Sequence, residues 1–177
     1  MNLIGVSGRK RSGKDSFAER LTAVHGFTRV AFADPMRELA LALDPLISEV
    51  WRLSELVDAF GWEGAKENPE VRRTLQRLGT EGGRKVLGEN IWVDTAMRTA
   101  RAADGPVVFT DVRVPNEAEA VKTAGGVVVR IERQGLPTGD THPSETALDD
   151  WRFDFIVHND STLEALHAEA DRVLSHA

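Results

Sequence analysis

The sequence predicts an α/β protein in which helices flank a five-stranded parallel sheet. The chain contains five short apolar runs, and apolar residues recur at helical spacing in segments between the first four runs and after the fifth. The first run, 2–7, is almost entirely apolar, as expected of a central parallel strand that is covered on both faces. A glycine-bounded loop joins this run to a helix at about 13–24. These observations favour a layered fold built around the first strand and the loop that follows it.

The loop after the first run has the spacing of a phosphate-binding loop. Gly8, four residues, Gly13 and Lys14 match the pattern G-x-x-x-x-G-K, but Asp15 stands where Ser or Thr is usual and Ser16 follows one position later. In such a loop the glycines turn backbone N–H groups inward, the helix offers its unpaired N-terminal donors to an anion, and the lysine reaches the outer phosphates. The alternative is a glycine-rich surface turn before an amphipathic helix.

The composition limits the classes of protein to consider. The 177 residues suit one domain. A net charge of -6 opposes broad binding to nucleic acid, whereas short clusters of arginine and lysine fit a small anionic ligand. Without cysteine, the chain can form neither a disulfide nor a thiolate metal site. No apolar run is long enough to span a membrane and no cleavable leader is recognised, so we predict a cytoplasmic protein.

The next elements follow from apolar spacing and from helix-start signals. A second strand at 28–32 completes a strand–helix–strand crossover unit with the first. Asp34-Pro35 then opens a helix. The segment 44–64 is rich in apolar residues and is expected to form one or two helices that cover a cleft.

A further helix is predicted from 69 to about 78, with three polar side chains on one face: Arg73, Gln76 and Arg77. Ion pairing of the arginines with Glu70 or Glu81 is the alternative to ligand binding. Glycines within 79–83 are expected to interrupt this helix, and helical character resumes at 84–87 and 92–101.

The third strand, 107–111, ends on Asp111, and Arg113 follows at the same edge of the sheet. A carboxylate at the C-terminal end of a buried strand lies where open α/β sheets bind ligands. Beside a phosphate-binding loop, this carboxylate is the natural acid on the Mg²⁺ side. The alternative role for Asp111 is to cap the helix that begins near Pro115.

The last part of the chain supplies strands at 127–131 and 153–157. Between them, 133–149 is polar and rich in turn residues, and it is predicted to form a mobile lid. The chemically interesting residues of this lid are His142, Ser144 and Glu145. A capping box made of Ser161 and Glu164 is expected to begin the final helix.

Many short motifs follow one another in a specific order along the chain. They comprise Ser7-Gly8, 10–16, 33–35, Arg37, 71–73, Gln76, 78–80, Trp92-Val93, Asp111, Arg113, Glu117, Asp140, His142, Glu145, 159–161, Leu163 and Leu166. In this order they resemble the phage deoxynucleoside monophosphate kinases, within the wider superfamily of P-loop nucleoside monophosphate kinases. The resemblance covers most of the chain, and the region 44–67 carries no recognised part of it.

The resemblance implies a three-layer P-loop kinase fold with a helical region for the nucleoside monophosphate at about 34–101 and a short lid at about 133–149. It implies the Mg²⁺-dependent transfer of the γ-phosphate of ATP to a deoxynucleoside monophosphate, which gives ADP and a deoxynucleoside diphosphate. The partners would be these small-molecule substrates, with no nucleic acid and no membrane. A symmetric homodimer is left open.

The resemblance also implies roles for individual residues. ATP would bind to Arg11, Ser12, Gly13, Lys14, Asp15, Ser16 and Asn159. Mg²⁺ would be held by Ser16 and, through water, by Asp111. The acceptor would bind to Lys10, Asp34, Arg37, Arg73, Gln76, Gly79, Thr80, Trp92 and Glu145, where Trp92 either stacks on the base or packs in the interior. Catalysis would rest on Lys14, Arg73, Asp111 and Arg113, with Arg130 or Arg133 as charge stabilisers near the lid.

Two other functions fit part of this pattern. A different small-molecule kinase, similar to the phosphomevalonate kinases, would reuse Lys14 and Asp111 but not the residues of the base pocket. A nucleotide-binding switch or ATPase would hydrolyse ATP slowly and would need no monophosphate acceptor. Neither the accepted bases nor the rejection of a ribose 2′-OH follows from the sequence.

Overall fold

The computed structural model describes residues 2–136 and 146–177. The chain divides into two compact units, which are described separately below. Unit 1 comprises Met1–Phe32 and Met97–Ala177, and unit 2 comprises Ala33–Ala96.

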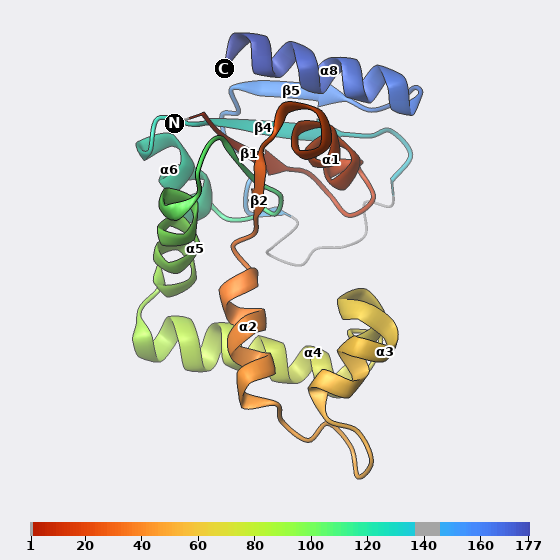
Figure 1. Ribbon diagram of the computed structural model, residues 1–177, viewed down its shortest axis with the longest axis vertical. Helices are drawn as coiled ribbons and strands as arrows, with labels where there is room; N and C mark the ends of the chain where they lie inside the picture. Colours follow the sequence, from red (N-terminus) through yellow and green to blue (C-terminus); the bar gives the residue numbers. More distant parts are fainter. Residues whose placement is uncertain (1, 137–145) are drawn as a thin grey trace. The chain divides into compact units, whose positions relative to one another are not determined.

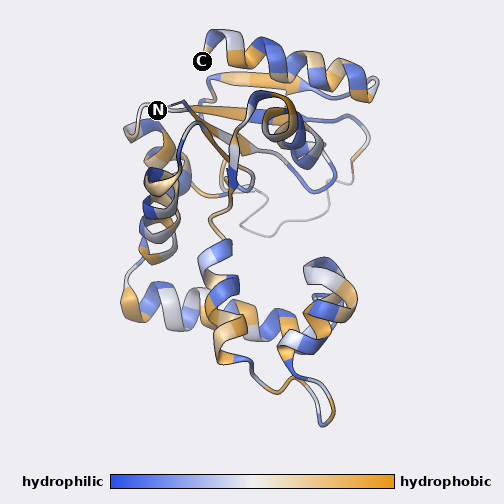
Figure 2. Cartoon of the chain, in the orientation of Figure 1, coloured by the Kyte–Doolittle hydropathy of each residue, from blue (hydrophilic) through white to orange (hydrophobic). Residues whose placement is uncertain are grey.

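Unit 1 is built on a five-stranded sheet (Figure 1). Its strands are β1 (Leu3–Ser7), β2 (Thr28–Val30), β3 (Val107–Phe109), β4 (Val127–Glu132) and β5 (Phe155–His158). Their order in the sheet is β2-β3-β1-β4-β5, and each neighbouring pair is parallel. Figure 2 shows that β1, β4 and β5 are hydrophobic along much of their length, as expected of strands that helices cover. The predicted five-stranded parallel sheet is confirmed.

Helices cover both faces of this sheet. They are α1 (Lys14–His25) and α8 (Leu163–His176) on one face and α6 (Pro115–Thr123) on the other. Because side chains alternate along a strand, Ile4 and Val6 of β1 join the buried cluster that contains Phe17 of α1 and Leu166 of α8. Gly5 faces the opposite layer, where an added Cβ would lie 2.9 Å from a methyl group of Val112 and 3.2 Å from one of Val121 in α6. Unit 1 therefore has three layers.

The topology of the sheet determines where a ligand would bind. β1 lies between β3 and β4 in the sheet. Along the chain, β2 and β3 come first and lie on one side of β1, and β4 and β5 follow and lie on the other side. The strand order therefore reverses at the C-terminal end of β1, which is the position where open parallel sheets bind ligands. The loop 8–13 begins at this point.

The predicted strand ends shift by one or two residues. The second and third strands end at Val30 and Phe109. The N–H of Thr110 still donates to the carbonyl of Val30 at 3.1 Å, but Phe32 donates its backbone N–H to the side chain of Asp111 and not to a neighbouring strand. The fifth strand begins at Phe155 because the carboxylate of Asp154 accepts the backbone N–H of Val128 at 2.7 Å. The predicted cap of the last helix is wrong by one residue, since Thr162 rather than Ser161 accepts the N–H of Ala165.

A cluster of charged side chains joins α1 to α8. The carboxylate of Asp171 in α8 accepts hydrogen bonds from Nη2 and Nε of Arg20 at 2.7 and 3.0 Å. Its Oδ1 also lies 2.7 Å from Nε2 of His25. The hydrogen bonds from Arg20 and His25 hold the pKa of Asp171 well below its ordinary value of 3.8.

Replacement of Asp171 by asparagine should lower the free energy of unfolding at pH 7 by about 0.5–1 kcal/mol, because partly exposed ion pairs are screened by water. A carboxylate whose pKa is lower in the folded than in the unfolded protein stabilises the fold at pH values above its pKa in the unfolded protein. This stabilisation is lost as the pH falls toward and through the pKa of the carboxylate in the folded protein. Urea titrations should therefore show a steeper loss of stability below about pH 4 in the wild type than in Asp171→Asn. Asp150→Asn, at an exposed aspartate, is the control. An equal effect of both substitutions would exclude this role for Asp171.

Unit 2 is helical. It contains α2 (Asp34–Leu43), α3 (Leu53–Ala65), α4 (Pro69–Gln76) and the π-helix η1 (Arg77–Leu87), and α5 (Ile91–Ala102) begins in it. Its core contains the buried side chains Ala40, Ile47, Leu53, Leu56, Ala65, Val71 and Leu75. The apolar segment 44–64 thus forms a loop followed by a helix, and the helix is kinked at Gly61, where φ is 65° and ψ is 171°.

The glycines at 79–83 do not interrupt the helix that precedes them, so this prediction is wrong. α4 continues directly into η1, which carries the backbone through all three glycines. Gly79 and Gly83 are buried, and an added Cβ at Gly83 would clash with the ring of Trp92. At Gly79 it would lie 2.7 Å from the sulfur of Met36. The two glycines therefore permit close packing instead of ending the helix.

None of the helices in the described part of the chain combines the length and apolarity of a transmembrane segment.

Candidate functional site

The loop between β1 and α1 has the backbone geometry that its glycines predict. Gly8 and Gly13 adopt φ values of 144° and 105°, which favour glycine, and Arg11 has a φ of 67°. The N–H of Ser12 donates to the carbonyl of Arg9 at 3.1 Å, and Nζ of Lys14 donates to the same carbonyl at 2.8 Å. The loop is thereby folded back on itself at the end of the central strand.

The same loop fits an anion. α1 begins at Lys14 after Gly13, which offers no side chain to cap the first N–H groups of the helix. The hydroxyl of Ser12 is fully buried, and its Oγ has no hydrogen-bond partner within the described residues. A buried polar group without a partner costs about 1–3 kcal/mol, and a phosphate oxygen could accept a hydrogen bond from this hydroxyl. Uncapped helix N–H groups and a buried unpaired donor are suited to the phosphates of a nucleotide.

Asn159, which follows β5, supports this loop from the far end of the sequence. Its Nδ2 donates to the carbonyl of Ser12 at 2.8 Å, and its backbone N–H donates to the carbonyl of Glu132 at 2.7 Å. An added Cβ at Gly13 would clash with the Asn159 amide, so this contact also requires glycine there. The structure thus places this predicted ATP-binding residue against the loop backbone.

Asp111 lies just beyond the C-terminal end of β3. Its Oδ1 accepts the backbone N–H of Phe32 at 2.7 Å, and the ring of Phe32 stacks on that of Phe109 at 4.4 Å between centroids. The start of α6 is stabilised by another carboxylate, because Oε2 of the buried Glu117 accepts the backbone N–H of Arg113 at 2.7 Å. The capping box of this helix is thus supplied by Glu117.

The donor types at this edge of the sheet fit Mg²⁺. The hydroxyl of Ser16, in the first turn of α1, and the carboxylate of Asp111 are oxygen ligands, which this ion prefers. Within residues 2–136 and 146–177, no three His, Cys, Asp or Glu side chains are grouped as a metal cage. Mg²⁺ in phosphoryl-transfer sites commonly takes one or two carboxylates and completes its shell with phosphate oxygens and water.

Asp149, at the end of the predicted lid, connects two basic side chains. Its Oδ1 lies 2.9 Å from Nη2 of Arg130, and its Oδ2 lies 3.5 Å from Nη2 of Arg9 in the loop. The guanidinium of Arg130 also lies 5.3 Å from the ring of Phe153. The central part of the predicted lid, 137–145, with His142, Ser144 and Glu145, lies outside the described residues.

In unit 2 the structure forms the ion pairs that the sequence allows as an alternative. Arg73 Nη2 lies 2.6 Å from Glu70 Oε2, and Arg77 Nε lies 3.8 Å from Glu81 Oε2. The side chains of Lys10 in unit 1 and of Arg73, Gln76 and Thr80 in unit 2 are exposed.

Trp92 lies in the interior of unit 2, with 7% of its surface exposed. Its Nε1–H donates to the carbonyl of Gly79 at 2.8 Å, and its ring fills the space that Gly83 leaves. Of the two roles that the sequence leaves open for Trp92, the structure shows the packed arrangement.

Arg37 occupies a different environment from the other arginines of unit 2. Its Nη1 lies 3.6 Å from Oδ1 of Asp34, and its guanidinium carbon lies 5.6 Å from the centre of the Trp62 ring. Trp62 belongs to the region 44–67, which carries no recognised part of the resemblance, so its contact with a predicted site residue could not be foreseen.

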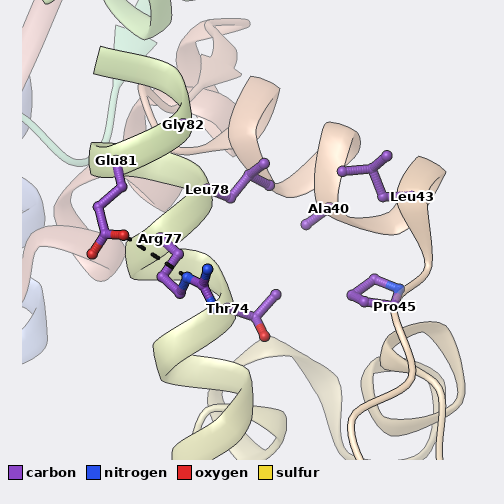
Figure 3. Close-up of a pocket in the computed structure, with 8 residues that line it drawn as sticks. All are labelled: Ala40, Leu43, Pro45, Thr74, Arg77, Leu78, Glu81 and Gly82. Carbon is purple, nitrogen blue, oxygen red and sulfur yellow. Dashed lines mark ion pairs between the residues drawn. The ribbon is translucent and has the colours of Figure 1, made fainter. Parts of the chain in front are cut away.

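A cavity of about 460 Å³ lies within unit 2 (Figure 3). The cavity is lined by residues of α2, of the loop that follows it, of α4 and of η1: Ala40, Leu43, Pro45, Thr74, Arg77, Leu78, Glu81 and Gly82. Figure 3 shows the Arg77–Glu81 ion pair on the wall that α4 and η1 supply. None of the residues predicted to bind ATP, Mg²⁺ or the acceptor lines this cavity.

Comparison with known proteins identifies the family. The family model described as "Deoxynucleotide monophosphate kinase" matches residues 54–170. A deoxynucleotide monophosphate kinase-like protein of Acanthamoeba polyphaga mimivirus is 31% identical over 192 residues, which cover 96% of this chain and 94% of the relative. The deoxynucleotide monophosphate kinase of Escherichia phage RB69 is 28% identical over 108 residues, which cover 59% of this chain but 44% of the phage enzyme.

The fold agrees with that of a small-molecule kinase. The structure of dephospho-CoA kinase from Campylobacter jejuni superposes with a TM-score of 0.51 and covers 99% of this chain and 96% of its own, at 15% sequence identity. The likeness supports the predicted P-loop kinase fold, and the family match supplies the identity. The chain belongs to the deoxynucleotide monophosphate kinase family and is a kinase.

Proposed function

We propose that this kinase transfers the γ-phosphate of ATP to a deoxynucleoside monophosphate in the presence of Mg²⁺ and releases ADP and a deoxynucleoside diphosphate. Phosphorylation of deoxynucleotide monophosphates is the activity for which the family is named. The observation that carries the proposal is the loop 8–13 in a chain of this family, because it combines an uncapped helix N-terminus with the buried, unpartnered hydroxyl of Ser12.

The donor phosphates are assigned to the loop and to the first turn of α1. Backbone N–H groups from Arg11 to Ser16 would hold the phosphate oxygens, as helix N-termini do. Lys14 is assigned to the β- and γ-phosphates, and its present contact with the carbonyl of Arg9 keeps the ammonium group at the loop. Asn159 would contribute by fixing the carbonyl of Ser12.

Mg²⁺, when bound, would neutralise charge on the transferred phosphoryl group. Ser16 is proposed to bind the ion directly and Asp111 through water. The hydrogen bond from Phe32 to Asp111 orients the carboxylate without neutralising its charge. Arg113 is proposed to stabilise the phosphoryl group from the same edge of the sheet.

Residues of unit 2 are proposed to bind the acceptor. Arg37 and Arg73 would clamp its phosphate, since a guanidinium group can make paired hydrogen bonds to phosphate oxygens. Lys10 is a further candidate from the loop. Asp34, Gln76 and Thr80 are assigned to the nucleoside, as is Glu145, which lies outside the described residues. Gly79 and Trp92 are assigned a supporting role beneath these acceptor-binding residues, because the hydrogen bond between Gly79 and Trp92 is buried.

The broader organisation stays a prediction. It comprises a helical acceptor-binding region at about 34–101, a lid at about 133–149, a location in the cytoplasm of a host cell, and the choice between monomer and homodimer. The substrates are small molecules, as expected of a kinase in this family.

A coupled assay of ADP release tests the proposed function. The purified chain is mixed with ATP, Mg²⁺ and each of dAMP, dCMP, dGMP and dTMP in turn. At least one of the four should stimulate ADP release, the deoxynucleoside diphosphate should appear in equal amount, and EDTA should stop the reaction. Slow release that no monophosphate stimulates would favour an ATPase or switch, and stimulation by phosphomevalonate alone would favour a different kinase.

A further inference from the structure

The guanidinium group of Arg37 contacts an aromatic ring as well as a carboxylate. Its Nε is buried and has no hydrogen-bond partner within the described residues. Its contact with Asp34, 3.6 Å between Nη1 and Oδ1, is longer than a hydrogen bond. The remaining contact is with Trp62, whose ring centre lies 5.6 Å from the guanidinium carbon, within the range of a cation–π interaction.

The local structure explains why Trp62 faces Arg37. α3 is broken at Gly61, whose φ of 65° favours glycine, so the chain changes direction immediately before Trp62. The indole then packs against the apolar core of unit 2, which also contains Ala40 of α2. The ring is anchored on one side by this core and contacts the guanidinium of Arg37, from the first turns of α2.

We infer that Trp62 is a positioning residue that holds Arg37 in place for the phosphate of the acceptor. This inference rests on the proposed function, because it takes the ligand of Arg37 to be a phosphate monoester. Asp34 balances part of the arginine charge, and the Trp62 ring fixes the plane of the guanidinium without using any of its N–H donors. The side chain of Arg37 keeps 22% of its surface exposed, through which a phosphate could reach it. The inference gives a role to α3, in the part of the chain that carries no recognised part of the family resemblance.

Substitution of Trp62 tests the inference through steady-state kinetics of the wild-type reaction. Trp62→Leu keeps an apolar side chain against the core but removes the aromatic face. It should raise KM for the deoxynucleoside monophosphate about tenfold, within the range of a desolvated cation–π contact, and leave KM for ATP unchanged. Trp62→Phe keeps an aromatic face and should restore most of the acceptor affinity. Trp51→Leu is the matched control, since Trp51 lies in the same unit but packs against Phe60 at 6.4 Å instead of an arginine.

A double-mutant cycle separates positioning from general stability. In the Arg37→Ala background, Trp62→Leu should not raise the acceptor KM further, because the side chain that it positions is gone. Should Trp62→Leu fail to fold, a fluorinated tryptophan placed at 62 alone preserves the shape of the ring and weakens its attraction for a cation; the acceptor KM should then rise. An unchanged acceptor KM, or an equal rise with and without Arg37, would overturn the inference. Failure of the wild type to phosphorylate any deoxynucleoside monophosphate would instead overturn the proposed function.

Discussion

Replacement of Lys14 by methionine should lower kcat by on the order of 10³-fold, about 4 kcal/mol in activation free energy. The lysine supplies the mobile positive charge of the loop, and methionine keeps most of its length while removing that charge. Because the backbone N–H groups remain, ATP should still bind, with a smaller change in its KM than in kcat. The measurement is the coupled assay under saturating ATP, together with ATP binding by calorimetry.

Lys122→Met is the matched control for this substitution. Lys122 is an exposed lysine of α6 in the same unit, and it pairs with Asp154 at 2.5 Å. Its replacement should leave the protein folded, since surface ion pairs contribute little to stability. Because Lys122 has no assigned role in the reaction, kcat should stay within about twofold of the wild type. Retention of more than a tenth of the wild-type kcat by Lys14→Met would contradict the role assigned to the loop lysine.

Replacement of Asp111 by asparagine should lower kcat by about 10²-fold, the cost of losing one well-placed electrostatic group. Asparagine can present a carbonyl oxygen to the N–H of Phe32, so this hydrogen bond can be kept. The loss should therefore report on the negative charge itself. The Mg²⁺ concentration that gives half-maximal rate should rise, because the metal shell loses a carboxylate.

Asp154→Asn controls for the loss of a carboxylate that accepts a backbone hydrogen bond. Asp154 accepts the N–H of Val128 immediately before β5, at the start of a strand and not at its C-terminal end. Its substitution should leave both kcat and the Mg²⁺ requirement close to wild type. If the two variants behaved alike, Asp111 would be a structural residue, and the metal assignment would have to be withdrawn.

The sheet and the loop could be predicted because both depend on local patterns. Each strand is a short apolar run, and the helices that separate the first four strands along the chain are typical of parallel pairing. The loop needs glycine at two positions for backbone reasons, and both Gly8 and Gly13 have positive φ. Both patterns span only a few neighbouring residues, so they can be recognised without knowledge of the tertiary packing.

The errors and omissions have a common physical cause. Gly79 and Gly83 were expected to end a helix, but their effect depends on Trp92 and Met36, which occupy the space beside them. The partnership of Trp62 with Arg37 likewise depends on the packing of α2 and α3. No spacing in the sequence signals which ring lies beside which side chain.

Asn159 has a consequence for the order in which the protein is made. The residues of the loop 8–13 are synthesised well before Asn159, whose amide fixes the carbonyl of Ser12. A nascent chain that stops before β5 would carry the loop sequence without its support from Asn159. The loop should therefore gain this support only after β5 has been synthesised and has joined the sheet.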